Sequence, residues 1–97
     1  MTIKPCKSYE IGSTVHKVLG EVLAIREKQD AQWGGTKHDD QHQSYDWIKF
    51  IERNMKRASK IAWDDHAADR AEYEQKLLNT AALAVAAVQS SRRKRGL

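Results

Sequence analysis

The residues best suited to chemistry lie close together in the sequence, between positions 29 and 47. This stretch holds two of the three tryptophans, two of the four histidines and four aspartates, together with a pair of adjacent glycines. Because ordinary surface loops carry smaller and less reactive side chains, we interpret this stretch as a candidate binding site. The alternative is that Trp33 and Trp47 close the end of a small core while the histidines and aspartates form a solvated turn.

The aromatic rings of this stretch favour a planar ligand, and the cationic side chains around it favour phosphate. Trp33, Tyr45 and Trp47 offer flat faces on which a nucleobase can stack. Guanidinium groups bind phosphate through two parallel hydrogen bonds, and arginines lie on both sides of the stretch. We therefore expect a nucleotide-like ligand. The expected ligand-binding residues are Arg26, Gln29, Asp30, Trp33, Gly34, Lys37, His38, Asp39, Asp40, His42, Tyr45, Trp47, Arg53 and Arg57.

Other chemistries find little support in the sequence. His38 and His42 have the H-x-x-x-H spacing, but the pair lacks the glutamate of a zinc-protease helix and has no cysteine nearby. Cys6 lies outside the stretch, no serine occupies a G-x-S-x-G turn, and no phosphate-binding glycine loop precedes a helix. We expect no catalytic residues, no metal site and no cofactor.

Length and composition restrict the class of protein. A chain of 97 residues forms one domain with a small core, which partner subunits would help to stabilise. The chain is 40% apolar and 31% charged, as in soluble globular proteins, and no apolar run approaches the roughly 18 residues that cross a bilayer. With a single cysteine and no hydrophobic leader in the first ten residues, we expect a cytoplasmic protein without membrane partners.

The net charge of +4 comes from the end of the chain. Arg92, Arg93, Lys94 and Arg95 supply four positive charges, which leaves 13 of the 17 basic residues against 13 acidic ones. Nucleic-acid-binding domains usually carry a basic face in their folded part. We therefore expect the basic run to end a helix and keep the chain soluble, without a nucleic-acid partner.

Hydrophobic periodicity predicts an all-α fold, with an N-terminal arm (1–12), a helical domain (13–91) and a basic C-terminal tail (92–97). The arm contains the only proline and no helical period, so we expect it to be extended. The first helix is predicted over 13–29, capped by Ser13, with apolar residues at three-and-four spacing. Gly34 and Gly35 then predict a loop over 31–43, and loops of that length are frequently functional.

Two further helices complete a small three-helix bundle, in which two long helices and a capping helix hold the functional loop between the first two. Ser44 is expected to cap the second helix, and a corner at 63–66, with Asp64 or Asp65 as cap, leads to a third over 67–91. Residues 81–88 are apolar around the whole helix, which predicts the bundle centre and a homo-oligomer interface. The expected buried stripe of the second helix is Trp47, Ile48, Ile51, Met55, Ala58 and Ala62.

The sequence also resembles a group of small phage and prophage proteins with the pattern E-R-x-R-Q-D-x-x-W-G followed by a histidine. The resemblance is carried by residues 24–35, by His38, Asp39, Asp40 and His42, and by the Leu/Ala/Val-rich third helix. Some of those proteins look like relatives of the MazG-type all-α nucleotide pyrophosphohydrolases, whose clustered carboxylates hold magnesium against the substrate phosphates. The resemblance implies a nucleotide ligand in the cytoplasm of a phage host.

This chain departs from the pyrophosphohydrolase pattern at the carboxylates. The acidic positions of the second helix fall on Arg53, Asn54 and Arg57, and a later aspartate falls near Asn79. Magnesium needs clustered oxygen ligands, so the resemblance implies binding without cleavage. In a phage setting, such a protein would sequester a bacterial immune signalling nucleotide. The implied contacts are stacking by Trp33 and Trp47, phosphate binding by Arg26, Arg53 and Arg57, and base or ribose recognition by His38 and Asp39.

Two other functions stay open from the sequence. The first is a magnesium-dependent nucleotide pyrophosphohydrolase that uses a different acidic set, and it predicts metal-dependent release of phosphate. The second is a protein-binding module whose aromatic stretch contacts a host factor, and it predicts no small-molecule ligand. The acidic set of the first would be Asp39, Asp40, Asp64, Asp65 and Asp69.

Overall fold

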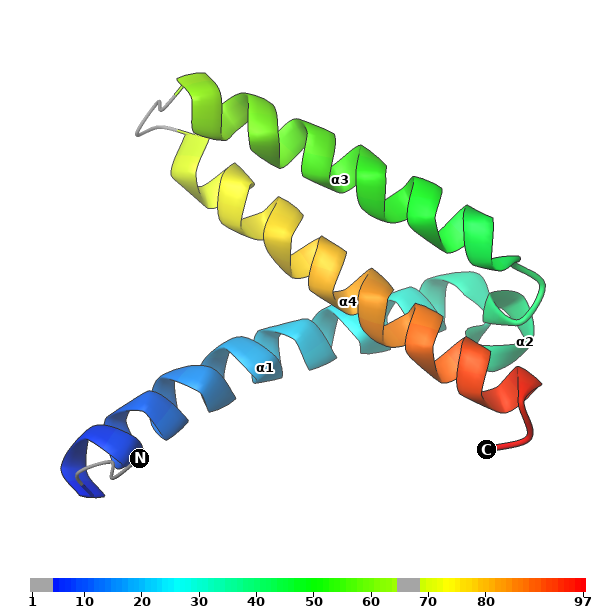
Figure 1. Ribbon diagram of the computed structural model, residues 1–97, viewed down its shortest axis with the longest axis horizontal. Coiled ribbons are helices and arrows are strands. Elements are labelled where there is room, and N and C mark those ends of the chain that lie inside the picture. Colours follow the sequence, from blue (N-terminus) through cyan, green and yellow to red (C-terminus); the bar gives the residue numbers. More distant parts are fainter. Residues whose placement is uncertain (1–4, 65–68) are drawn as a thin grey trace.

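The computed structural model describes residues 5–64 and 69–97, with side chains from residue 14 onward, and these ranges are helical apart from short turns. The helices are α1 (Pro5–Trp33), α2 (Gly35–Asp39), α3 (Ser44–Asp64) and α4 (Arg70–Lys94). In Figure 1, α3 and α4 run side by side in opposite directions, while α1 crosses α4 and projects from the rest as an arm. The all-α prediction is confirmed. No helix in the described ranges is long and apolar enough to span a membrane.

The buried core is small and lies mainly between α3 and α4. Its centre is formed by Trp47, Leu83 and Ala86, with Phe50, Ile51 and Ala87 packed around them. Ala82 and Ala86 have no exposed surface, because alanine side chains let neighbouring helices approach closely. The apolar segment 81–88 therefore lies at the centre of the bundle as predicted, although Val85 and Val88 on the same segment remain exposed.

The first helix is longer at both ends than the sequence predicted. Residues 5–12 belong to α1, where we expected an extended arm, and residues 1–4 lie outside the described residues. Pro5 is compatible with this because the first residues of a helix leave their N–H groups unpaired. At the other end α1 continues past Gln29 to Trp33, and Gly34 then ends it by donating its N–H to the Asp30 carbonyl oxygen at 3.0 Å.

The prediction of a long loop over 31–43 is wrong, because this segment contains the last residues of α1, the short helix α2 and a tight turn. Gly34 and Gly35 have φ angles of 97° and 70°, in the left-handed region that glycine adopts without strain. They redirect the chain within two residues, so the glycine pair makes a sharp corner between two helices. Most residues of the candidate site therefore belong to helices and not to a loop.

Helix α3 begins with Ser44, which was predicted to be its cap, and its buried stripe is displaced from the predicted one. The hydrogen bond at its start comes from the Gln43 backbone N–H, which donates to the Asp46 carboxylate at 2.9 Å. Ile48 and Met55 are 49% and 42% exposed, in contrast to the prediction. The side of α3 that packs inward carries Trp47, Phe50, Ile51, Asn54, Ala58 and Ile61, and Ala62 is exposed.

The structure also differs from the predicted corner over 63–66 and from the predicted tail over 92–97. Helix α3 continues to Asp64, while Asp65 and His66 lie outside the described residues. Asp69 precedes α4 without a capping side-chain hydrogen bond. Helix α4 extends to Lys94, so half of the predicted basic tail is helical.

The corner at Gly34 can be tested by adding a single methyl group. Gly34→Ala should lower the free energy of unfolding by about 1–2 kcal/mol, because an L-residue is strained at this φ. The added Cβ would meet only His38 Cβ at 3.8 Å, an ordinary contact, so the cost is in the backbone. Urea denaturation at a fixed protein concentration measures it.

Gly20→Ala is the matched control, because Gly20 lies inside α1 with open space around it. This change should raise stability by up to about 1 kcal/mol, since alanine is the better helix former. Equal effects of the two substitutions would contradict the special role of Gly34.

Candidate functional site

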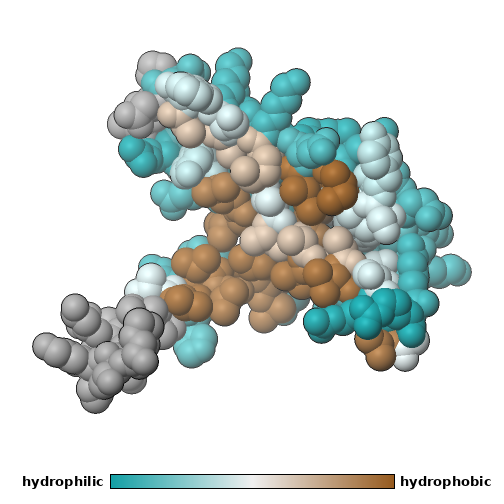
Figure 2. Space-filling model, in the orientation of Figure 1, coloured by the Kyte–Doolittle hydropathy of each residue, from teal (hydrophilic) through white to brown (hydrophobic). Residues whose placement is uncertain are grey.

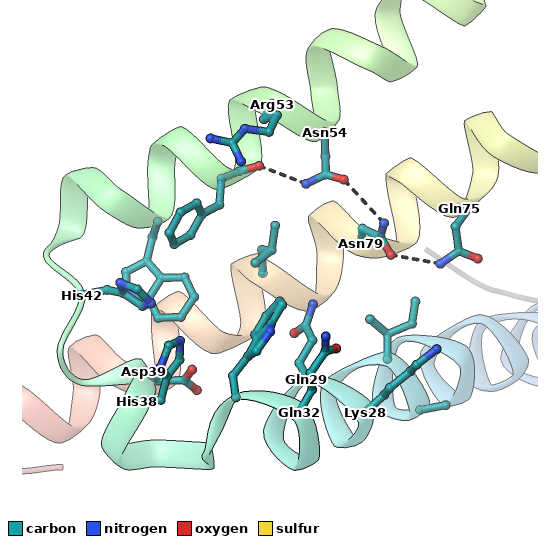
Figure 3. A pocket seen from close by; sticks show the side chains of 16 residues that line it. Lys28, Gln29, Gln32, His38, Asp39, His42, Arg53, Asn54, Gln75 and Asn79 are labelled. Carbon is teal, nitrogen blue, oxygen red and sulfur yellow. Dashed lines mark hydrogen bonds between the residues drawn. The ribbon is translucent and has the colours of Figure 1, made fainter.

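A pocket of about 690 Å³ lies where α1, α3 and α4 converge above the α2 corner (Figure 3). Its volume falls within the range of sites that hold small ligands. Half of the fourteen predicted binding residues line it, so the stretch chosen from the sequence does contribute to one cavity. These lining residues are Gln29, Trp33, His38, Asp39, His42, Trp47 and Arg53.

Aromatic and imidazole rings form a continuous series along one side of the pocket. Trp33 lies 6.1 Å from His38 between ring centroids, and His38 lies 5.0 Å from His42 in an edge-to-face contact. His42 in turn meets Trp47 and Phe50, both at 5.1 Å. Such edge-to-face contacts fix the orientation of neighbouring rings. The series connects the end of α1, through α2 and the following turn, to the start of α3.

The two tryptophans have different surroundings. Trp47 is only 6% exposed and belongs to the core, and its indole N–H is buried without an acceptor among the described residues. Trp33 is 45% exposed and lines the pocket. Of the two tryptophans that line the pocket, Trp33 is therefore the one with accessible ring surface on which a ligand can stack.

Amide side chains form a second wall, which the sequence analysis did not include in the site. Gln75 Nε2 donates to Asn79 Oδ1 at 2.9 Å, and Asn79 Nδ2 donates to Asn54 Oδ1 at 3.5 Å. Asn54 Nδ2 completes this series of hydrogen bonds by donating to the Phe50 carbonyl oxygen at 3.0 Å (Figure 3). Amides keep further donor and acceptor capacity after one such bond. The sequence signal was the pair of amides four residues apart, at 75 and 79.

Two cationic side chains, Lys28 and Arg53, line the pocket from α1 and α3 (Figure 3). Within the described part of the chain, neither forms an ion pair or a hydrogen bond. The one carboxylate that lines the pocket, Asp39, is already paired with an arginine. The pocket therefore offers unpaired positive charge to an anion.

Arg26 lies behind the pocket and binds protein groups. Its Nη1 donates to Gln29 Oε1 at 3.0 Å, and its Nη2 donates to Asp30 Oδ1 at 3.0 Å and to Asp39 Oδ2 at 3.1 Å. Arg26 and Asp39 are 8% and 4% exposed. The guanidinium thus joins α1 to α2, and the structure gives it no phosphate-facing position.

The carboxylate of Asp40, the residue that follows α2, points toward α4. Asp40 accepts hydrogen bonds from Arg93 Nη2 at 2.8 Å and from Ser90 Oγ at 2.9 Å, and these bonds lower the pKa of Asp40. Lys94 Nζ donates to the His42 carbonyl oxygen in the same corner. Part of the basic run at the chain end therefore holds the turn that carries His42.

The remaining predicted residues lie away from the pocket. Arg57 donates two hydrogen bonds to Glu72, at 2.7 and 3.0 Å, and this pairing raises the pKa of Arg57. Tyr45 is 67% exposed, with the Lys49 ammonium 4.9 Å from its ring centroid. Gly34 forms the corner, and Lys37 is exposed on α2.

The acidic set of the alternative hydrolase is not brought together. Asp39 and Asp40 bind arginines of different helices, while Asp64 and Asp69 lie at the far end of the α3–α4 pair (Figure 1). Asp65 lies outside the described residues. Among described side chains, no three His, Cys, Asp or Glu residues form a group that could hold a metal ion.

Three of the positions singled out through the phage-protein resemblance meet on one wall. Arg53, Asn54 and Asn79 all line the pocket, whereas Arg57 does not. Comparisons with known proteins find no matching family model, no similar curated protein and no similar solved structure. What this site can bind is therefore inferred from its own side chains.

Breaking the buried pair behind the pocket should strongly destabilise the fold. Arg26→Met should lower the free energy of unfolding by about 3–5 kcal/mol, because it leaves the Asp39 carboxylate buried without its counter-charge. The double variant Arg26→Met/Asp39→Leu should recover much of that loss. Arg57→Met, which breaks an exposed pair, is the control and should change stability little. A double variant no more stable than Arg26→Met would contradict this interpretation.

The contact between α2 and α4 should give a specific pH dependence. Because the folded state holds the Asp40 proton less tightly than the unfolded chain, the ionised carboxylate stabilises the fold at pH values above its ordinary pKa of 3.8. This contribution disappears as the pH falls below 3.8 through the lowered pKa. Asp40→Asn should therefore be less stable at neutral pH, with a gap that narrows in acid. Urea unfolding across pH measures the gap, and a constant gap would refute the pairing.

Proposed function

We propose that this protein binds a nucleotide-like, phosphorylated ligand in the pocket and does not cleave it. The observation that carries the proposal is the combination around one cavity of an accessible indole, a wall of amides and two unpaired cations. A nucleotide has the matching parts, namely a flat base, a hydrogen-bonding edge and an anionic phosphate. A purely apolar ligand would leave these polar and charged groups without a partner.

Each part of the pocket has a role in this proposal. The base stacks on Trp33, and the amides of Asn54, Gln75 and Asn79 recognise its polar edge. Lys28 and Arg53 neutralise the phosphate. This assignment keeps Arg53 among the expected phosphate contacts and adds Lys28, while Arg26 and Arg57 serve to hold helices together.

The absence of cleavage follows from the oxygen ligands available. Magnesium-assisted hydrolysis needs several carboxylate or phosphate oxygens around the ion. Asp39 is the carboxylate that lines the pocket, and Arg26 already occupies one of its oxygens. A bound nucleotide is consequently held intact. In the setting implied by the resemblance, holding it would sequester an immune signalling nucleotide in the host cytoplasm.

Isothermal titration against a panel of linear and cyclic nucleotides tests the proposal. At least one should bind, and Trp33→Ala should weaken it by roughly 10-fold or more, since stacking on an aromatic ring contributes about 1–3 kcal/mol per base. Arg53→Ala should weaken it similarly. Arg57→Ala is the matched control and should bind as the parent does, because Arg57 pairs with Glu72 outside the pocket.

Two results would overturn the proposal. Release of phosphate or pyrophosphate from a bound nucleotide in the presence of Mg²⁺ or Mn²⁺ would show an enzyme. Failure of every nucleotide to bind the folded parent protein would instead favour a protein-binding module.

A further inference from the structure

The segment of α1 from residue 14 to residue 23, called the α1 arm below, projects from the rest of the molecule. It carries an apolar face that the described chain does not cover. Every side chain from residue 14 to residue 21 is exposed. Val15, Val18, Leu19 and Leu23 are 46%, 45%, 56% and 58% exposed. In Figure 2 apolar surface runs along this part of α1 toward the centre of the molecule. This face continues the side of α1 on which Val22 and Arg26 are buried.

This segment is a poor candidate for a helix that stands alone in water. It is rich in residues with weak helix propensity, including Thr14, Val15, Val18 and Gly20. Isolated helices of about 15 residues are marginal even when they are rich in alanine, and most helices depend on packing of an apolar side. The helical conformation of the arm therefore indicates that another molecule packs against its apolar side.

The total surface of the chain supports the same conclusion. Its accessible area is 7614 Å², whereas a folded monomer of 11.1 kDa exposes about 5,700 Å². Its radius of gyration is 16.0 Å, against about 12.5 Å for a typical domain of this length. The excess of about 1,900 Å² exceeds the roughly 800 Å² that each partner buries in a stable complex. One chain thus has surface to spare for a dimer interface.

We propose that a second copy of this chain covers the arm, with the two α1 helices antiparallel and the two-fold axis near Leu19. Val15, Leu19 and Leu23 are spaced by four residues and are symmetric about Leu19. An antiparallel pair then places Leu19 beside its own copy and Val15 beside Leu23 of the partner subunit, which makes the interface self-complementary. The proposal does not depend on the ligand.

Helix α4 is the less suitable surface for this dimer, although its sequence predicted the interface. Val85 and Val88 are exposed on α4, but α3 packs along that helix and supports it. The described arm of α1 has no such neighbour (Figure 1). The arm therefore gains more from association than α4 does.

Light scattering coupled to size-exclusion chromatography tests this dimer across the micromolar concentration range. The parent protein should have twice the chain mass of 11.1 kDa. Leu19→Glu should weaken the dimer at least about 100-fold, since it places two like charges in an apolar contact. Val88→Glu, at a similarly exposed apolar site on α4, is the matched control and should remain dimeric. A monomeric parent, or a dimer broken by Val88→Glu and kept by Leu19→Glu, would overturn the proposal.

Disulfide trapping tests the orientation in a background where Cys6→Ser removes the other thiol. Leu19→Cys should form a cross-linked dimer under mild oxidation, because the axis brings the two copies of position 19 together. Val15→Cys should not, because antiparallel packing separates its two copies by about 12 Å along the helices. Cross-linking by both variants would indicate parallel helices and contradict the antiparallel pair.

Discussion

The ion pair between Arg26 and Asp39 is the contact on which the site depends most. A buried charge is tolerated only with a counter-charge, so Arg26 constrains α2 to lie against α1. The two residues are separated by only thirteen positions, and the left-handed corner at Gly34 lets the chain turn back within that length. The next residue, Asp40, forms an ion pair with Arg93 of α4. Helix α2, although only five residues long, thereby joins α1 to α4.

This arrangement explains how rings from three segments come to share one pocket. Trp33 lies just before the corner, His38 lies on α2, and His42 lies in the turn that the Lys94 ammonium holds. The fixed corner sets the contacts between these rings, and the packing of Trp47 in the core anchors the later rings of the series. The pocket is thus a consequence of electrostatic pairing behind it as much as of the apolar core beside it.

The sequence was sufficient to predict the all-α class, the density of chemical groups around residues 29–47 and the central position of segment 81–88. It was insufficient for Arg26, because a buried structural arginine and a phosphate-binding arginine have the same local sequence. The glycine pair predicted a loop, since adjacent glycines are equally compatible with flexibility and with a sharp corner. The buried stripe of α3 was displaced because Phe50 and Asn54 faced a neighbour whose position the period alone does not give. The amide wall depends on α3 and α4 meeting, so only the fold reveals it.

The distribution of positive charge also acquires a physical meaning once the pairs are known. Arg26, Arg57 and Arg93 each bind a carboxylate and hold two segments together. Lys28 and Arg53, which have no such partner in the described chain, both line the pocket. Two cations without a partner in the described chain therefore line one cavity, while the carboxylate that lines it, Asp39, is already paired with Arg26. Net charge counted along the sequence cannot reveal this pairing, because it depends on which charged side chains the fold brings together, and the two unpaired cations support the proposed anionic ligand.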